Sequence, residues 1–116
     1  MVELSRAEFE ALVDRALDQV PPELSALVTN VVVLVEEEAP ADDPDLLGLY
    51  EGIAMTEREH TPGGVLPDRI LIFRRPLQEM CETTDELVEE VRITVVHEIA
   101  HHFGLDDARL HELGYA

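Results

Sequence analysis

The sequence has 116 residues, of which 46% are hydrophobic and 4% aromatic, so we expect a single domain, residues 1–116, with a largely aliphatic core. Eight Lys and Arg residues stand against 26 Asp and Glu, which gives a net charge of −18. A surface this acidic repels nucleic acid and anionic membranes and favours cations, including metal ions and basic polypeptides. Taken alone, the negative charge is also explained by a simpler role, which is to keep the protein soluble.

Cys81 is the only cysteine, which excludes an intrachain disulfide and a cysteine-rich zinc cluster. The N-terminal residues lack the basic start and apolar run of a signal peptide. No apolar run approaches the roughly 18 residues that span a bilayer. We therefore expect a cytoplasmic protein with no membrane or nucleic-acid partner, and the sequence does not predict its oligomeric state.

The first predicted element is an amphipathic helix. Ser5 and Glu8 have the spacing of a capping box, in which each side chain accepts a hydrogen bond from the other residue's backbone amide. Apolar residues then recur at helical spacing as far as Pro21 and Pro22, which end the helix. One further turn can follow Pro22, and we expect the helix to pack against a sheet.

Three segments predict strands. Residues 31–35 are a continuous aliphatic run, typical of a strand that is buried on both faces. Residues 46–51 predict a second strand, and residues 69–73 a third that ends at Arg74 and Arg75. We expect these two arginines to form surface ion pairs with the many carboxylates.

Residues 53–68 are the longest stretch without periodicity and contain a Thr-Pro-Gly-Gly turn signal. Long loops in small domains are usually functional or mobile. We interpret this one as a flap over a functional site, in which His60 could contact a substrate or an oxyanion. A solvated loop histidine is the simpler interpretation of the same residue.

Two helices are predicted after the third strand. Thr83 or Thr84 caps the first of them, whose first turn is acidic, as the helix dipole favours. Its aliphatic side chains and Phe103 fall on one arc, and Gly104 can take the left-handed conformation that ends a helix. A short final helix, residues 108–113, follows.

The first of these helices contains His97-Glu98-Ile-Ala-His101. Residues four apart project from one face of a helix, so the two imidazoles can bind the same cation. Glu98 points about a quarter-turn away and can reach a water that the metal activates. Because the two histidines fall outside the apolar arc, this spacing predicts a zinc site with His97 and His101 as ligands and Glu98 as general base. Solvated histidines are the alternative, but they leave Glu98 unexplained.

The third ligand is expected just after the helix. Asp107 lies three residues after Gly104, which gives the pattern H-E-x-x-H-x-x-G-x-x-D. This pattern resembles the metzincin arrangement, in which the last residue, usually histidine, is the third zinc ligand. We therefore choose Asp107 first, with Asp106, His111 and Glu112 as substitutes in that order.

Three motifs together resemble the small bacterial zincin-like metallopeptidase family, long described as a domain of unknown function. The likeness covers nearly the whole chain and rests on His97-Glu98-Ile-Ala-His101-His102-Phe-Gly104, Gly48-Leu-Tyr50-Glu-Gly52 and Leu66-Pro67-Asp68-Arg69-Ile70. The resemblance implies a minimal zincin fold of the α+β class. This fold has a three- or four-stranded mixed sheet, an N-terminal helix, and an active-site helix beneath the sheet.

The predicted function is that of a zinc-dependent peptidase. With Zn²⁺ held by His97, His101 and Asp107, Glu98 would take the proton of the attacking water and pass it to the leaving amine. A peptide or protein substrate would lie extended along an exposed edge strand above the helix.

Four further residues are candidates for supporting roles. Tyr50, His60 and Tyr115 are the side-chain donors that could stabilise the oxyanion. His102 is turned about 100° from the neighbouring ligand, so we expect it to make a structural or supporting hydrogen bond.

Two other functions fit parts of the pattern. A ribosomal-RNA maturation nuclease has H-x-x-x-H-x-x-G-x-D-H, which the two motif histidines, Gly104 and Asp106 match. Glu98 stands where the nuclease pattern has glycine, and Asp107 stands where it has the final histidine. A net charge of −18 would also repel the phosphates of RNA. A non-catalytic or partner-dependent metal-binding module is the second alternative, and the intact Glu98 counts against it.

Overall fold

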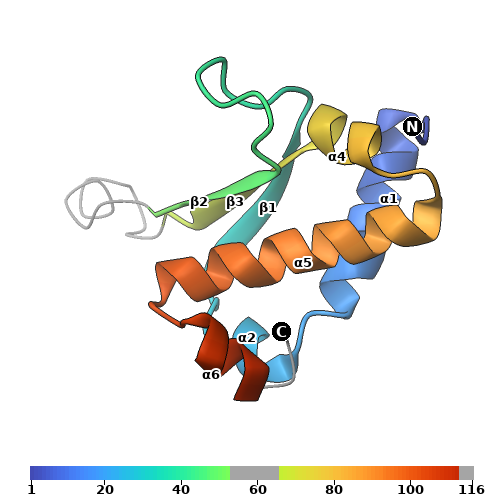
Figure 1. Ribbon diagram of the computed structural model, residues 1–116. Helices are drawn as coiled ribbons and strands as arrows, with labels where there is room; N and C mark the ends of the chain where they lie inside the picture. Colours follow the sequence, from blue (N-terminus) through green and yellow to red (C-terminus); the bar gives the residue numbers. More distant parts are fainter. Residues whose placement is uncertain (53–65, 113–116) are drawn as a thin grey trace.

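The computed structural model describes residues 1–52 and 66–112, except the side chain of Asp107. Within these residues lie five helices and three strands: α1 (Arg6–Asp18), α2 (Pro22–Ser25), β1 (Val31–Glu36), β2 (Gly48–Glu51), β3 (Asp68–Phe73), α4 (Arg74–Met80), α5 (Thr84–His102) and α6 (Asp107–Glu112). Helix α5 runs beneath the sheet and α1 lies beside it (Figure 1). This is the small α+β arrangement that the resemblance implies.

The sheet is mixed and has the strand order β1-β3-β2. β1 is parallel to β3, and β2 is antiparallel to β3. In the register Leu34 pairs with Leu71, which pairs in turn with Leu49. Both outer strands therefore have one edge that no other described strand covers.

The prediction that the first strand is buried on both faces is wrong. Along β1 the side chains alternate, with Val35 buried but Val32 and Leu34 exposed to 38% and 39%. The reason is that the helices cover only one face of this sheet. Aliphatic composition alone does not distinguish a strand covered on both faces from one covered on a single face.

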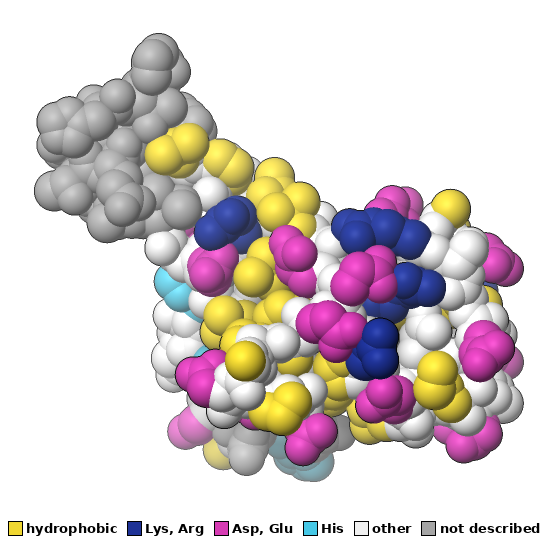
Figure 2. All heavy atoms as spheres, turned by 90° about the horizontal axis from the view of Figure 1, so that it is seen from above, with side chains coloured by type: hydrophobic (Ala, Val, Ile, Leu, Met, Phe, Trp, Pro, Cys, Tyr) yellow, Lys and Arg dark blue, Asp and Glu magenta, His cyan; other side chains and the backbone are white. Residues whose placement is uncertain are grey.

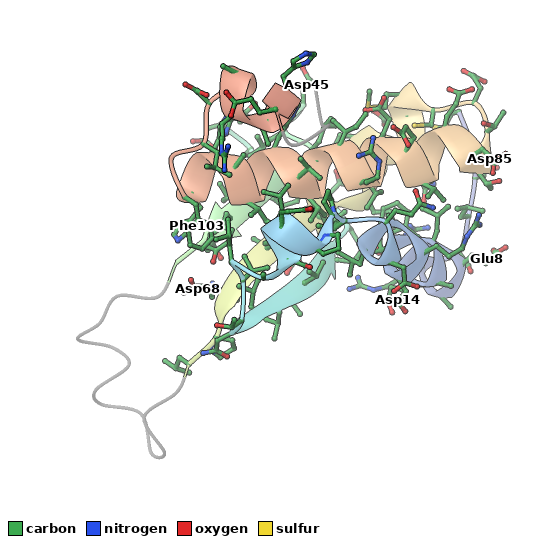
Figure 3. All side chains as sticks on the ribbon, turned by 90° about the horizontal axis from the view of Figure 1, so that it is seen from below. Glu8, Asp14, Asp45, Asp68, Asp85 and Phe103 are labelled. Carbon is green, nitrogen blue, oxygen red and sulfur yellow. The ribbon has the colours of Figure 1, made fainter. Side chains whose placement is uncertain are left out.

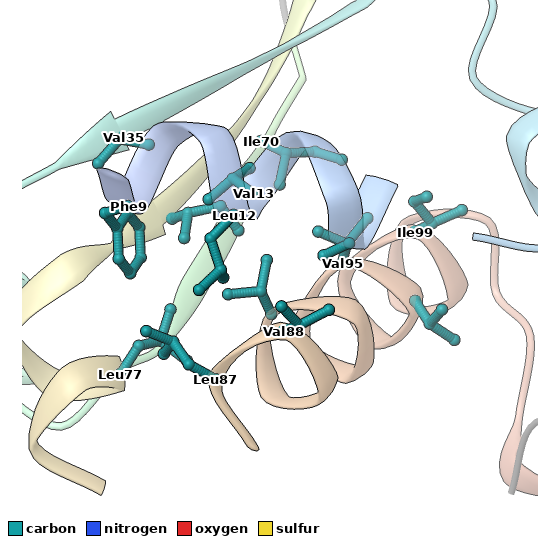
Figure 4. Close-up of a cluster of buried hydrophobic side chains, with 14 of the residues drawn as sticks. Phe9, Leu12, Val13, Val35, Ile70, Leu77, Leu87, Val88, Val95 and Ile99 are labelled. Carbon is teal, nitrogen blue, oxygen red and sulfur yellow. The ribbon is translucent and has the colours of Figure 1, made fainter. Parts of the chain in front are cut away.

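The core lies between α1, α5 and the covered face of the sheet (Figure 4). It includes Phe9, Leu12 and Ala16 of α1, together with aliphatic residues of α5, all of them buried. The predicted apolar arc of α5 is buried except for Phe103, which is 41% exposed. Phe103 is the C-cap of α5, where the chain turns away from the core.

Local sequence signals fix the first helix as predicted. The Ser5 side chain accepts a hydrogen bond from the Glu8 backbone N–H, and the Glu8 carboxylate accepts one from the Ser5 N–H. The extra turn after Pro21 is α2. The other predicted boundaries agree with the structure to within two residues.

Helix α4 was not predicted, because Arg74-Arg75-Pro76 was interpreted only as the end of a strand. Proline is tolerated in the first turn of a helix, where backbone amides lack helical partners, so Pro76 is compatible with α4. The expected ion pairs are confirmed, since Arg74 pairs with Glu37 and Arg75 with Glu38. No helix in the described residues has the length and apolarity needed to cross a bilayer.

Candidate functional site

Helix α5 carries the candidate site, and local sequence sets both of its ends. The Thr83 hydroxyl caps the first turn by accepting a backbone N–H at 3.1 Å. At the other end Gly104 has a φ of 70°, and the N–H groups of Gly104 and Leu105 donate to the carbonyls of His101 and Ala100. This pair of hydrogen bonds is a Schellman ending, which turns the chain back directly after the motif histidines.

His97 and His101 lie one turn apart on the exposed face of α5. Both line a cavity of about 320 Å³, whose other walls are Leu105, Asp106 and Leu110. The two imidazoles are nitrogen donors, which suit Zn²⁺ better than Mg²⁺ or Ca²⁺. The residues that the motif predicted as ligands therefore open onto one cavity, and their chemistry fits zinc.

The residues after the turn differ in what they do. The Asp106 carboxylate accepts the Arg109 backbone N–H at 2.8 Å and so caps α6. Glu112 pairs with the Arg109 guanidinium, and His111 is exposed. The side chain of Asp107, our first choice of third ligand, lies outside the described part of the chain. Among the side chains that the structure describes, no three of His, Cys, Asp or Glu are grouped closely enough to hold a metal ion.

Glu98 contacts the sheet. One oxygen of its carboxylate accepts the Tyr50 backbone N–H at 2.9 Å. Because Leu47 accepts a bond from Phe73 of β3, alternation along the strand directs the Tyr50 N–H away from β3, towards the outer edge of β2. The motif glutamate is therefore anchored to the edge of β2 that faces away from β3.

Tyr50 also contacts the end of α5 through its side chain. Its ring stacks on the His102 imidazole with centroids 3.8 Å apart, and its hydroxyl donates to the Asp68 carboxylate at 2.8 Å. Phe103 packs edge-on against both rings, and Figure 3 shows Phe103 and Asp68 at the same end of the molecule. A Cβ on Gly52 would approach the His102 ring to 3.3 Å. This aromatic cluster joins α5 to β2 and β3 beside the histidine cavity.

Sequence reasoning named Tyr50 and His102 as candidates but assigned no role to Asp68. Asp68 is the first residue of β3 and lies within the Leu-Pro-Asp-Arg-Ile motif. This motif is the sequence feature that could have marked Asp68 as a candidate. His60 and Tyr115 lie outside the described residues.

The comparisons with known proteins agree with this architecture. Residues 28–115 match the family described as zincin-like metallopeptidase. A solved structure, a conserved hypothetical protein from T. thermophilus, superposes with a TM-score of 0.56 at 22% identity, covering 86% of this chain and 94% of that one. No curated protein matches the sequence. At this identity the solved structure supports the fold alone, whereas the family match covers most of the chain and both motif histidines. The chain therefore belongs to the zincin-like metallopeptidase family.

Proposed function

We propose that the protein is a zinc-dependent peptidase whose general base is Glu98. The observation that carries the proposal is the placement of Glu98 between two features. Its helix presents His97 and His101 to one cavity, and its own carboxylate is bound to the edge strand β2. A peptidase needs the metal ligands, the base and a strand edge for the substrate in one place.

His97, His101 and Asp107 are the proposed zinc ligands. When bound, zinc supplies a Lewis acid that polarises the substrate carbonyl and lowers the pKa of water. Leu105 is packed against the core and Leu110 is buried, so the turn beside the histidines has an internal support.

Glu98 would move the proton in the reaction. The Tyr50 N–H holds one carboxylate oxygen, which orients the second oxygen for proton transfer. Water would lose a proton to Glu98 as its oxygen bonds to the carbonyl carbon, and the proton would then pass to the amine nitrogen as the C–N bond breaks. Positioned bases of this kind contribute about 10²- to 10⁴-fold to the rate.

The substrate would be a peptide in extended form along β2. Strand pairing binds a backbone without reading much of its sequence. Selectivity would come from the cavity beside the histidines, where Leu105 and Leu110 form an apolar wall. We propose a preference for an apolar side chain next to the cleaved bond.

Digestion of a peptide library, with the products identified by mass spectrometry, tests the proposal. The zinc-loaded protein is compared with zinc-loaded Glu98→Gln, which keeps the shape of the side chain and removes the base. Glu90→Gln, two turns earlier on α5, is the matched control and should cleave like the wild type. Cleavage by the wild type and control that Glu98→Gln loses supports the peptidase. No cleavage by any of them, with zinc bound, favours a non-catalytic or partner-dependent metal-binding module.

A further inference from the structure

The outer edge of β1 lies at the other side of the sheet from β2, and no other described strand covers it. β1 pairs with β3 alone among the described strands. The Val35 carbonyl accepts a hydrogen bond from the Arg6 guanidinium at 2.5 Å, so this carbonyl points away from β3. Alternation along the strand then directs the N–H and C=O of Val33 to the same outer edge. An exposed edge of this kind is a template for another strand.

A groove runs along this edge. It has a volume of about 360 Å³ and lies between α1 and β1. Val13 and Leu17 of α1 form its apolar wall opposite Val33. Because side chains alternate along a strand, a segment added to β1 would place every second side chain in this groove.

The other side chains of an added segment would extend the open face of the sheet. Val32 and Leu34 of β1 are more than one-third exposed on that face. Leu34 also begins the row of paired leucines that continues through Leu71 and Leu49. Figure 2 looks onto the molecule from above and shows hydrophobic side chains lying between charged ones. Both sides of an added strand would therefore meet apolar side chains.

The charges around the groove identify its occupant. Glu10, Asp14 and Glu36 contribute three carboxylates, against the single guanidinium of Arg6, which already pairs with Glu10 and Glu37. The whole chain carries −18, so a second copy would meet like charge at long range. We propose that the outer edge of β1 and the groove beside it bind an extended, basic segment of a partner polypeptide by strand addition. Arg6 occupies the Val35 carbonyl, so pairing is centred on Val33.

A synthetic nine-residue peptide of alternating Lys and Val, labelled with fluorescein, is a direct probe of this surface. Fluorescence anisotropy should show binding at low ionic strength that weakens as salt is added. A second peptide of the same sequence carries an N-methyl group on every backbone amide nitrogen, which removes the hydrogen-bond donors from both of its edges without removing charge. We expect at least a tenfold loss of affinity for the methylated peptide. Equal binding of both peptides would mean that charge alone attracts them, and would overturn the proposal.

Val33→Pro is the matching change in the protein. It removes an N–H that does not pair with β3, and proline is tolerated at such edge positions. Val33→Ala shortens the same side chain and keeps the N–H, so it should bind the probe far better than Val33→Pro. Equal affinity of the two variants contradicts strand addition at Val33.

Two further measurements keep the test decisive. If Val33→Pro loses its far-UV circular dichroism, amide NMR of the wild type decides, because the bound peptide should shift the Val33 amide signal and leave the His101 amide unchanged. Sedimentation velocity without peptide should show a monomer at micromolar concentration. A dimer that Val33→Pro dissociates would assign the edge to a second copy and overturn the basic partner. None of these measurements requires zinc or peptidase activity.

Discussion

The Glu98 carboxylate accepts the Tyr50 backbone N–H at 2.9 Å, so the glutamate of the His-Glu-x-x-His motif is anchored to the strand above its helix. The hydrogen bond links a side chain of α5 to the main chain of β2. It does not depend on which side chain occupies position 50. The proposed base therefore has a structural role that stability measurements can separate from its chemistry.

Glu98→Gln and Glu98→Ala separate those two roles. Glutamine keeps a carbonyl oxygen that can accept the Tyr50 N–H, so we expect stability close to that of the wild type. Alanine leaves this N–H without its carboxylate acceptor, and we expect a loss of about 1 kcal/mol. Urea denaturation of the metal-free proteins measures both effects. Equal stability of the two variants would show that the hydrogen bond contributes nothing to folding.

Asp106 and Asp107 are adjacent aspartates for which we expect opposite effects. The Asp106 carboxylate caps α6 by accepting the Arg109 N–H at 2.8 Å, so Asp106→Ala should lower the free energy of unfolding by about 1 kcal/mol. The same variant should keep most of the zinc affinity. Asp107→Ala should lower zinc affinity at least tenfold, measured by competition with a chelator, while changing stability less. Unchanged zinc affinity in Asp107→Ala would move the third-ligand assignment to another residue.

His102 is expected to support the site through its ring rather than by binding metal. Its imidazole stacks on Tyr50 with centroids 3.8 Å apart. His102→Phe retains an aromatic ring and should keep zinc affinity and stability. His102→Ala should lose about 0.5 to 1.5 kcal/mol, the contribution of an aromatic pair beyond its buried area. His101→Ala is the contrasting variant, because it should lose zinc binding itself.

Gly48 allows β2 to approach α5 closely. A Cβ at this position would lie 2.6 Å from the Thr94 methyl carbon and 3.0 Å from the Leu71 carbonyl oxygen. Gly48→Ala should therefore destabilise the fold by about 1 to 3 kcal/mol. Thr94→Ser removes the methyl group and keeps the hydroxyl that donates to the Glu90 carbonyl at 2.8 Å. In a double-mutant cycle, Thr94→Ser should restore part of the loss, and strict additivity would contradict the contact.

The capping box should contribute a pH-dependent part of the stability. The pKa of Glu8 lies below its ordinary value because the Ser5 backbone N–H, and then the Ser5 hydroxyl, stabilise the carboxylate. The unfolded chain therefore binds the proton more readily, and the stabilisation is present above the ordinary pKa of glutamate. It is lost as the pH falls through the lowered, folded value. Denaturant titrations should show that Glu8→Gln is less stable than the wild type at pH 7 and that the difference shrinks as the pH falls below the ordinary pKa of glutamate. A difference that is constant with pH would exclude this linkage.

The sequence alone determined the elements whose signals are local. The capping box of Ser5 and Glu8 was correctly predicted, and the helix cap was narrowed to Thr83 or Thr84, of which Thr83 is the cap, because these residues interact with backbone groups a few positions away. The helical ending at Gly104 was predicted for the same reason. The common face of His97 and His101 also follows from helical periodicity and needs no tertiary contact.

Tertiary structure decided the contacts between segments distant in the chain. Tyr50 and Glu98 are 48 positions apart, and Tyr50 and Asp68 are 18 apart, so no local spacing relates them. The exposure of Val32 and Leu34 likewise depends on α1 and α5 covering only one face of the sheet, which an aliphatic run does not encode. Local hydrogen bonds and periodicity determine where helices begin, end and point, whereas burial and strand pairing decide what anchors Glu98 and which strand edges no described strand covers.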